Sequence, residues 1–116
     1  MTVQIVLLTV LCVFGISLGQ LLFKQAATGL TQVAGWQGWL FNGWLISALM
    51  LYGVTTLLWV WILRHASLHL AYPFMGLAFL IVPVLAHFFL GEPLHFKTLL
   101  GGALILLGVS LAASAA

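Results

Sequence analysis

Charged side chains are nearly absent from this chain, and their scarcity constrains its fold more than any other feature. Only Lys24, Arg64, Lys97 and Glu92 carry a formal charge, which is 3% of the 116 residues. In a typical soluble domain about a quarter of the residues are charged. Hydrophobic residues make up 65% of the chain, so a soluble fold would lack a polar surface. The composition therefore predicts an all-α, multi-pass membrane protein.

The remaining polar groups exclude several classes of function. A net charge of +2 is too small for a nucleic-acid-binding face or a polybasic lipid anchor. Cys12 is the only cysteine, so no disulfide framework is expected. Four histidines occur without a carboxylate cluster, and no nucleophile lies at a useful spacing from a base. We therefore expect no metal site, no cofactor and no enzymatic activity.

Four apolar stretches are each long enough to cross a bilayer, which takes about 20 residues as a helix. The first has neither a basic segment before it nor a small-x-small cleavage motif after it, so we expect a permanent helix rather than a signal peptide. Tryptophans at 36, 39 and 44 suit a membrane interface, and part of 36–41 is expected to form a short interfacial helix. The predicted spans are residues 3–24, 44–63, 70–90 and 96–113, in one domain over 1–116.

The first span ends with a polar stripe on one face and small residues on the other. At about 100° per residue, Ser17, Gln20 and Lys24 fall within about 60° of one another. Gly15 and Gly19 fall on the opposite side, where they would allow close helix packing. A helix surrounded by lipid uses neither feature. We therefore expect this helix to lie inside a bundle and to line a path or pocket.

The second span carries hydroxyl groups on one face. Tyr52, Thr55, Thr56 and Trp59 recur there at helical spacing. Threonine hydroxyls commonly bond back to the carbonyls of their own helix, and this is the preferred interpretation. A role in a transport pathway is the alternative.

Two prolines shape the third span. Pro73 is expected in its first turn, where the missing N–H had no partner, or as a kink if the helix begins earlier. Pro83 is interior and is expected to kink or loosen the helix.

One line of the third span is expected to face the polar stripe of the first. It runs through Tyr72, Gly76, Phe79, Pro83 and His87 at helical offsets. His87 itself is interpreted as a residue near the helix end, in contact with the interface.

Glu92 is the only acidic side chain and lies between the third and fourth spans. Three interpretations are open: it caps the fourth helix, accepts from Lys97, or faces water. Capping is the most economical, because an anion at a helix N-terminus is favourable. In the fourth span, Gly101 and Gly108 belong to a small-residue stripe that suits either an oligomer contact or packing within the chain.

Membrane orientation does not follow from the charges. Four spans place both termini on one side, with Lys24 and Lys97 on the other side and Arg64 on the side of the termini. This bias is too small for the positive-inside rule. Dual insertion and an antiparallel dimer are compatible with it.

Four short motifs carry a resemblance to a known family. They are Gly19-Gln20-x-x-x-Lys24-Gln25-Ala26, Ala71-Tyr72-Pro73, Gly91-Glu92-Pro93, and Gly101-Gly102 with Gly108. Together they resemble the drug/metabolite transporter superfamily. Within it the chain is similar to the four-helix EamA-like proteins, which include the small subunits of the aminoarabinose-phosphoundecaprenol flippase. The resemblance implies half of an inverted-repeat transporter in a bacterial inner membrane, paired with itself or with a similar small protein.

The other four-helix branch of the superfamily, the small multidrug resistance proteins, differs at diagnostic positions. Its members carry a membrane-embedded glutamate eight residues before a lysine, where this chain has Ile16. They also carry a tryptophan three residues after the tyrosine of the third helix, where this chain has Met75. A proton-coupled cation exporter needs that carboxylate. A lysine without an embedded acid instead favours an anion such as a lipid phosphate.

We therefore expect a flippase for an amphipathic anion, such as a polyprenyl-phosphate-linked sugar. The alternatives are a small multidrug-type exporter and a non-transporting subunit of a larger complex. Lys24 either binds the phosphate or reaches toward water along apolar surface. The residues expected to bind substrate are Ser17, Gln20, Lys24, Arg64, Tyr72, Pro73 and Gly76. Those expected in structural or dimer contacts are Gly15, Gly19, Glu92, Gly101 and Gly108.

Overall fold

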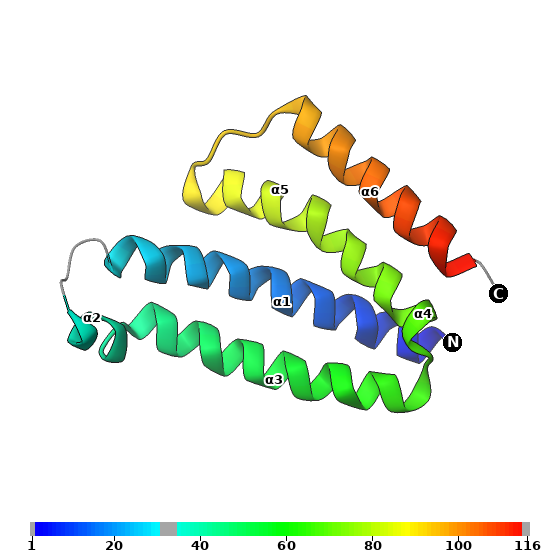
Figure 1. Cartoon of the computed structure of the whole chain (residues 1–116), viewed down its shortest axis with the longest axis horizontal. Helices are drawn as coiled ribbons and strands as arrows, with labels where there is room; N and C mark the ends of the chain where they lie inside the picture. Colours follow the sequence, from blue (N-terminus) through cyan, green and yellow to red (C-terminus); the bar gives the residue numbers. More distant parts are fainter. Residues whose placement is uncertain (1, 31–34, 115–116) are drawn as a thin grey trace.

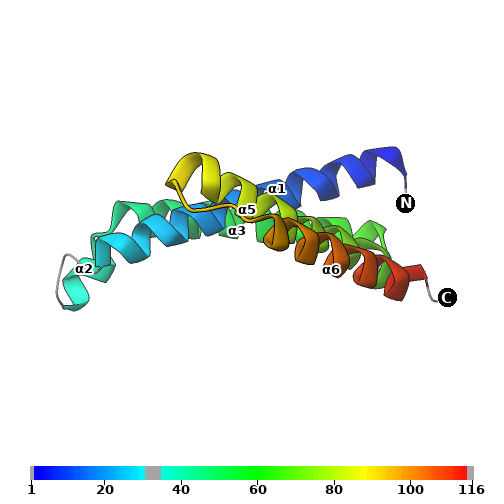
Figure 2. The same cartoon turned by 90° about the horizontal axis from the view of Figure 1, so that it is seen from above.

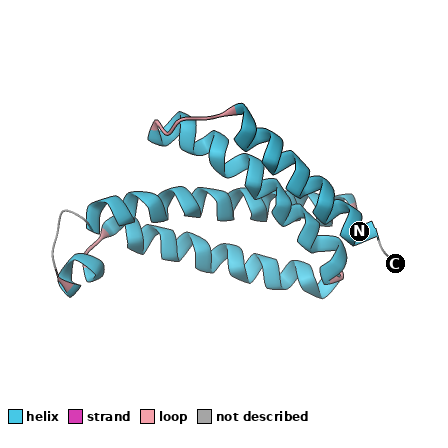
Figure 3. Ribbon diagram, turned by 45° about the horizontal axis from the view of Figure 1, so that its top comes forward, coloured by secondary structure: helices cyan, strands magenta, loops and turns pink. Residues whose placement is uncertain are grey.

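The structure is a computed structural model that describes residues 2–30 and 35–114, so part of the expected interfacial loop, residues 31–34, lies outside them. All regular structure in these ranges is helical (Figures 1 and 3). The elements are α1 (Val3–Leu30), α2 (Trp36–Leu40), α3 (Gly43–His65), α4 (Leu68–Ala71), the 3₁₀ helix η1 (Tyr72–Leu77), α5 (Ala78–Leu90) and α6 (Phe96–Ser114).

Within the described ranges, four helical stretches are long and apolar enough to cross a membrane. They are α1, α3, α6 and the continuous run Leu68–Leu90. The four-span, all-α prediction is confirmed, as is the short helix α2. The first helix is longer than predicted because Lys24, Gln25 and Thr28 end the apolar run but not the helix. The helix continues to Leu30, and within this last part Thr28 Oγ1 donates to the Lys24 carbonyl at 3.1 Å.

The long helices lie side by side in the order α3, α1, α5, α6, and Figure 2 shows the layer from its edge. The shortest dimension of the chain is 20 Å, against 50 Å for the longest. Helix α1 packs on α3 and α5, and α6 packs on α5 and η1. Both termini lie at one end of the layer, and α2 and the connector before α6 lie toward the other (Figure 1).

The interface between α1 and α3 is the tightest part of the layer. A Cβ added to Gly15 would lie 2.6 Å from Thr55 Cγ2. Cys12 Sγ donates to the Thr55 carbonyl at 3.2 Å. The hydroxyls of Thr55 and Thr56 both donate to the Tyr52 carbonyl, at 2.9 and 2.7 Å. The preferred interpretation of these threonines, bonding within their own helix, is confirmed.

Asn42 fastens the start of α3 to the end of α1. Its Oδ1 accepts from the backbone N–H groups of Trp44 and Leu45, which are otherwise unpaired at a helix start. Its Nδ2 donates to the Ala26 carbonyl at 2.8 Å. One side chain therefore caps α3 and fixes its position against α1.

The third span begins at Leu68, so Pro73 lies inside it rather than in its first turn. The backbone changes from α to 3₁₀ at Tyr72–Leu77 and returns to α at Ala78. Proline lacks an N–H and crowds the carbonyl four residues earlier, which accounts for the change around Pro73. At Pro83, by contrast, α5 continues as an α-helix.

Pro83 nevertheless frees a carbonyl, and α6 packs on it. Because Pro83 has no N–H, the carbonyl of Phe79 loses its partner in the helix. Gly102, the only buried residue of α6 in the described range, lies against this carbonyl. A Cβ at Gly102 would lie 2.8 Å from Phe79 O and 2.9 Å from Leu80 Cδ2. The close approach of α6 to α5 therefore needs glycine at this position.

Gly102→Ala is predicted to destabilise the protein by about 1–3 kcal/mol, since the backbone of Phe79 cannot yield cheaply. The matched control is Gly101→Ala, where an added Cβ meets nothing within 4 Å. That change should be neutral or stabilise by up to about 1 kcal/mol through helix propensity. Thermal unfolding of the detergent-solubilised chain measures both. Equal stabilities of the two variants would contradict the tight α5–α6 contact.

Candidate functional site

A groove lies between α1, α5 and α6, and we call it the α1–α6 groove. It consists of two adjoining hollows of about 560 and about 380 Å³. Four residues line both of them: Gln20, Val82, Pro83 and Thr98. The same helix contacts that place Gly102 against Phe79 therefore form one wall of this groove.

Polar side chains gather at the end of the groove that is remote from the termini. Helix α1 supplies Gln20 and Lys24, which are one helical turn apart. The first turn of α6 supplies Lys97 and Thr98. Glu92 enters from the connector between α5 and α6. All five side chains are exposed.

Apolar side chains form the rest of the groove wall. They are Ile16, Phe79, Val82 and Ile105, which come from α1, α5 and α6. Gly101 adds open space, because its missing Cβ would touch nothing within 4 Å. The groove is therefore amphipathic along its length, with charged groups at one end.

Ser17 does not join Gln20 and Lys24 in this groove. Its side chain is fully buried and donates to the Val13 carbonyl at 2.8 Å. The helical phase of the three residues is as predicted, but their surroundings change along the helix. The stripe is covered by packing at the level of Ser17 and open at Gln20 and Lys24.

Most of the expected partners from the third span lie outside the α1–α6 groove. Tyr72 is 58% exposed and does not line the groove. It precedes Pro83 by 11 residues, and because the first part of this stretch is 3₁₀ helix, the two lie about 16–20 Å apart along the span. Gly76 is buried against Leu106 of α6, since a Cβ there would lie 3.0 Å from Leu106 Cδ1. Of the expected line, only Phe79 and Pro83 reach the groove.

Pro73 and Arg64 lie toward the same far end as Tyr72. Pro73 is in η1, and Arg64 is exposed in the last turn of α3. Three polar groove residues, Glu92, Lys97 and Thr98, were not among the residues expected to bind substrate. The span topology could have identified them, because the start of the fourth span lies on the same membrane side as the end of the first span, which carries Lys24.

The connector holds Glu92 in place through its backbone. Gly91 adopts φ = 71°, a left-handed conformation that favours glycine and ends α5. The N–H of Glu92 then donates to the Ala86 carbonyl at 3.3 Å. The carbonyl of Glu92 pairs with His87 Nδ1 at 2.9 Å. Both backbone polar groups of Glu92 are thus bonded to the end of α5.

The expectation that Glu92 caps the fourth helix is wrong. Helix α6 begins four residues later, at Phe96, and its first turn contains no acidic residue. Within the described part of the chain, Glu92 forms no ion pair with Lys97 or Lys24. Glu92 instead lines the groove.

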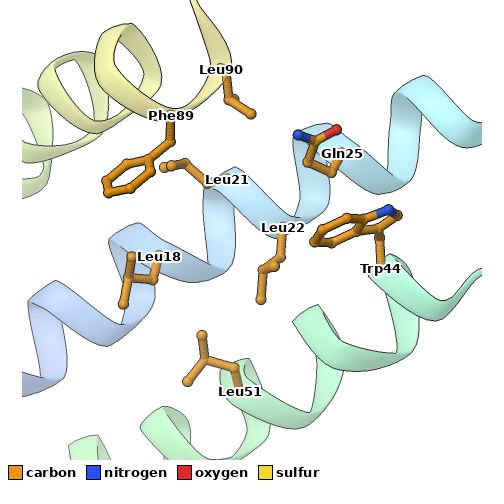
Figure 4. Close-up of a pocket in the computed structure, with 8 residues that line it drawn as sticks. All are labelled: Leu18, Leu21, Leu22, Gln25, Trp44, Leu51, Phe89 and Leu90. Atoms are coloured by element: carbon orange, nitrogen blue, oxygen red, sulfur yellow. The ribbon is translucent and has the colours of Figure 1, made fainter.

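A third hollow, of about 420 Å³, lies on the other side of α1, against α3 and the end of α5 (Figure 4). Its lining is apolar apart from the Gln25 amide of α1 and the Trp44 indole of α3, both drawn in Figure 4. Leu21 and Leu90 line both this hollow and the α1–α6 groove. The polar end of α1 is therefore flanked by apolar space that suits a hydrocarbon chain.

The fold and the groove together define a small multi-pass membrane protein with an amphipathic site between its helices. The chain is 42% identical over 97 residues to a probable 4-amino-4-deoxy-L-arabinose-phosphoundecaprenol flippase subunit ArnE of Pectobacterium atrosepticum, covering 82% of this chain and 85% of the relative. Proteins of the same description from Enterobacter sp. (36% over 98 residues; 84% and 86% covered) and Aeromonas salmonicida (31% over 110 residues; 93% and 95% covered) are also similar.

The chain therefore belongs to the family of the ArnE flippase subunits. The resemblance to the EamA-like branch seen in its motifs is confirmed. No protein-family model matches the chain, and no solved structure matches it.

Cysteine labelling distinguishes the groove residues from the buried one. In a Cys12→Ser background, which retains a donor toward the Thr55 carbonyl, Gln20→Cys and Lys24→Cys should react with a maleimide in detergent. Ser17→Cys should react at least about tenfold more slowly, because its side chain is reached only through local opening. Mass spectrometry of timed samples gives the rates. Equal rates at positions 17 and 20 would place Ser17 in the groove after all.

Proposed function

We propose that this chain is a subunit of a flippase that moves a polyprenyl-phosphate-linked sugar across the bacterial inner membrane. The observation that carries the proposal is the exposed Lys24 beside Gln20 in a groove with apolar walls. The relatives add support, since their names describe an amino-sugar phosphate on undecaprenol.

Lys24 is suited to hold the phosphate. It has no ion-pair partner within the described residues, so its charge is available to a ligand. A cation at the end of a membrane span favours an anion, and lipid phosphates are the abundant anions there. A lysine ammonium bonds phosphate oxygens as a compact charge. Lys97 adds a second cation from the α6 side of the same groove.

Gln20 is suited to hold the sugar. It lies one turn from Lys24 toward the middle of α1 and lines both hollows. Its amide can both donate and accept, which matches sugar hydroxyls. The Thr98 hydroxyl offers the same chemistry from the opposite wall. The polyprenyl tail would follow the apolar wall of the groove toward lipid.

A second four-helix chain is part of this proposal. Only 6–28% of each spanning segment is buried within the chain, so the single layer cannot surround a polar head group. Helix α6 presents Leu104, Leu107 and Leu111 at 61–74% exposure, with Gly108 open beside them. The relatives are named as subunits. A homodimer or a heterodimer with a similar small protein would work by rocking one half against the other.

Replacement of Lys24 tests the phosphate anchor. Lys24→Ala should weaken binding of undecaprenyl phosphate by about tenfold, because a charge-assisted hydrogen bond is lost. Lys24→Glu should weaken it by more, because the new carboxylate also repels the phosphate. The matched control is Arg64→Ala, which removes an exposed cation at the far end of the layer and should leave binding unchanged. Binding is measured on the chain reconstituted in nanodiscs.

Retention of phosphate binding in both Lys24 variants would show that Lys24 is not the anchor. Proton-coupled transport of a soluble cation by the reconstituted wild type would contradict the flippase proposal altogether.

A further inference from the structure

The α1–α6 groove contains charges of both signs that do not neutralise each other. Lys24 and Glu92 line the same hollow of about 380 Å³, together with Gln20 and Thr98. Neither has an ion-pair partner within 4.0 Å among the described residues. Two opposite charges that share a hollow without pairing leave each one available to a ligand.

The backbone of Glu92 is also fixed by hydrogen bonds on both its N–H and its carbonyl. Its N–H is bonded to the Ala86 carbonyl, and its carbonyl is bonded to His87 Nδ1 at 2.9 Å. Gly91 in the left-handed conformation precedes it, and Pro93, with its restricted φ, follows it. Glu92, the only acidic residue of the protein, therefore lines the groove from a backbone that is bonded to the end of α5.

A ligand that carries only a phosphate fits this arrangement poorly. Its negative charge would bind at Lys24 in a hollow that also contains the carboxylate of Glu92, and like charges in one site disfavour binding. A ligand with an additional ammonium group removes this cost, because the ammonium can donate charge-assisted hydrogen bonds to the carboxylate. The hollow and its neighbour are each within the range of about 300–1,000 Å³ in which proteins hold small molecules.

We propose that Glu92 is a specificity-determining residue that selects a lipid whose head group carries a primary ammonium in addition to its phosphate. Lys24 binds the phosphate and Glu92 binds the ammonium, so the two residues together recognise a zwitterionic head group. The inference rests on the proposed function for the phosphate at Lys24 and extends it to the other end of the head group. Two lipids share this chemistry, an amino-sugar polyprenyl phosphate and phosphatidylethanolamine.

The test compares each lipid with its N-acetylated form, which keeps the shape and the phosphate but has no positive charge. The full chain is reconstituted in phosphatidylglycerol nanodiscs, and the affinity of all four lipids is measured for wild type and Glu92→Gln. This substitution preserves side-chain size and leaves the two backbone hydrogen bonds of residue 92 available. Wild type should prefer the free amine by about tenfold or more, as expected for a hydrogen bond between charged groups.

Glu92→Gln should reduce that preference to about one, and it should keep or raise the affinity for the N-acetylated lipid, because the carboxylate that disfavours the phosphate is gone. Lys24→Gln should instead weaken binding of the free and acetylated forms alike. If the free amine is preferred only in the amino-sugar lipid, the site is assigned to that lipid. If it is preferred only in phosphatidylethanolamine, the site is assigned to phosphatidylethanolamine. Either result supports the role of Glu92.

Two outcomes would overturn the inference, and they differ in what else they affect. If wild type binds the free and acetylated forms equally, or if Glu92→Gln keeps the preference, Glu92 does not select an ammonium and the proposed phosphate site stands. If wild type binds none of the four lipids, the proposed function fails, and this inference fails with it.

Discussion

The contact of Gly102 with the Phe79 carbonyl is the interaction on which the site depends. Pro83 removes the N–H that would have satisfied this carbonyl, and in a membrane an exposed polar backbone group must be covered by protein or water. Gly102 lets the backbone of α6 cover it. The contact holds α6 beside α5, and Pro83 and Gly102 then form part of the groove wall. One missing hydrogen bond thus positions the helix that carries Lys97 and Thr98.

The two ends of the groove differ in polarity, because the charged residues lie at one end only. The described spans hold no acidic side chain, since Glu92 lies in the connector between α5 and α6. Lys24, Lys97 and Glu92 all lie at the end remote from the termini, while Arg64 lies at the other. The apolar wall between these ends suits a hydrocarbon tail. A lipid with a charged head group therefore matches the groove better than a soluble ion does.

The flat layer leaves most of the apolar surface of its helices uncovered by the chain itself. Few side chains of any span are buried within the chain, and the apolar face of α6 is open. Without a hydrophobic drive between helices in lipid, close packing of small residues is the available source of association. The relatives are named as flippase subunits, which supports the proposed association with a second chain.

The sequence by itself determined the membrane class, the four spans, the hydrogen bonding of the threonines and the positions of the charges, because an apolar run of about 20 residues in lipid must be a helix. It also placed Gln20 and Lys24 on one stripe. Only the tertiary structure decided that Ser17 is buried while Gln20 is open, that Tyr72 lies outside the groove, and that Glu92 lines the groove rather than capping α6. The physical reason is that helical phase gives the direction of a side chain, whereas the neighbouring helix that covers it depends on contacts between distant segments.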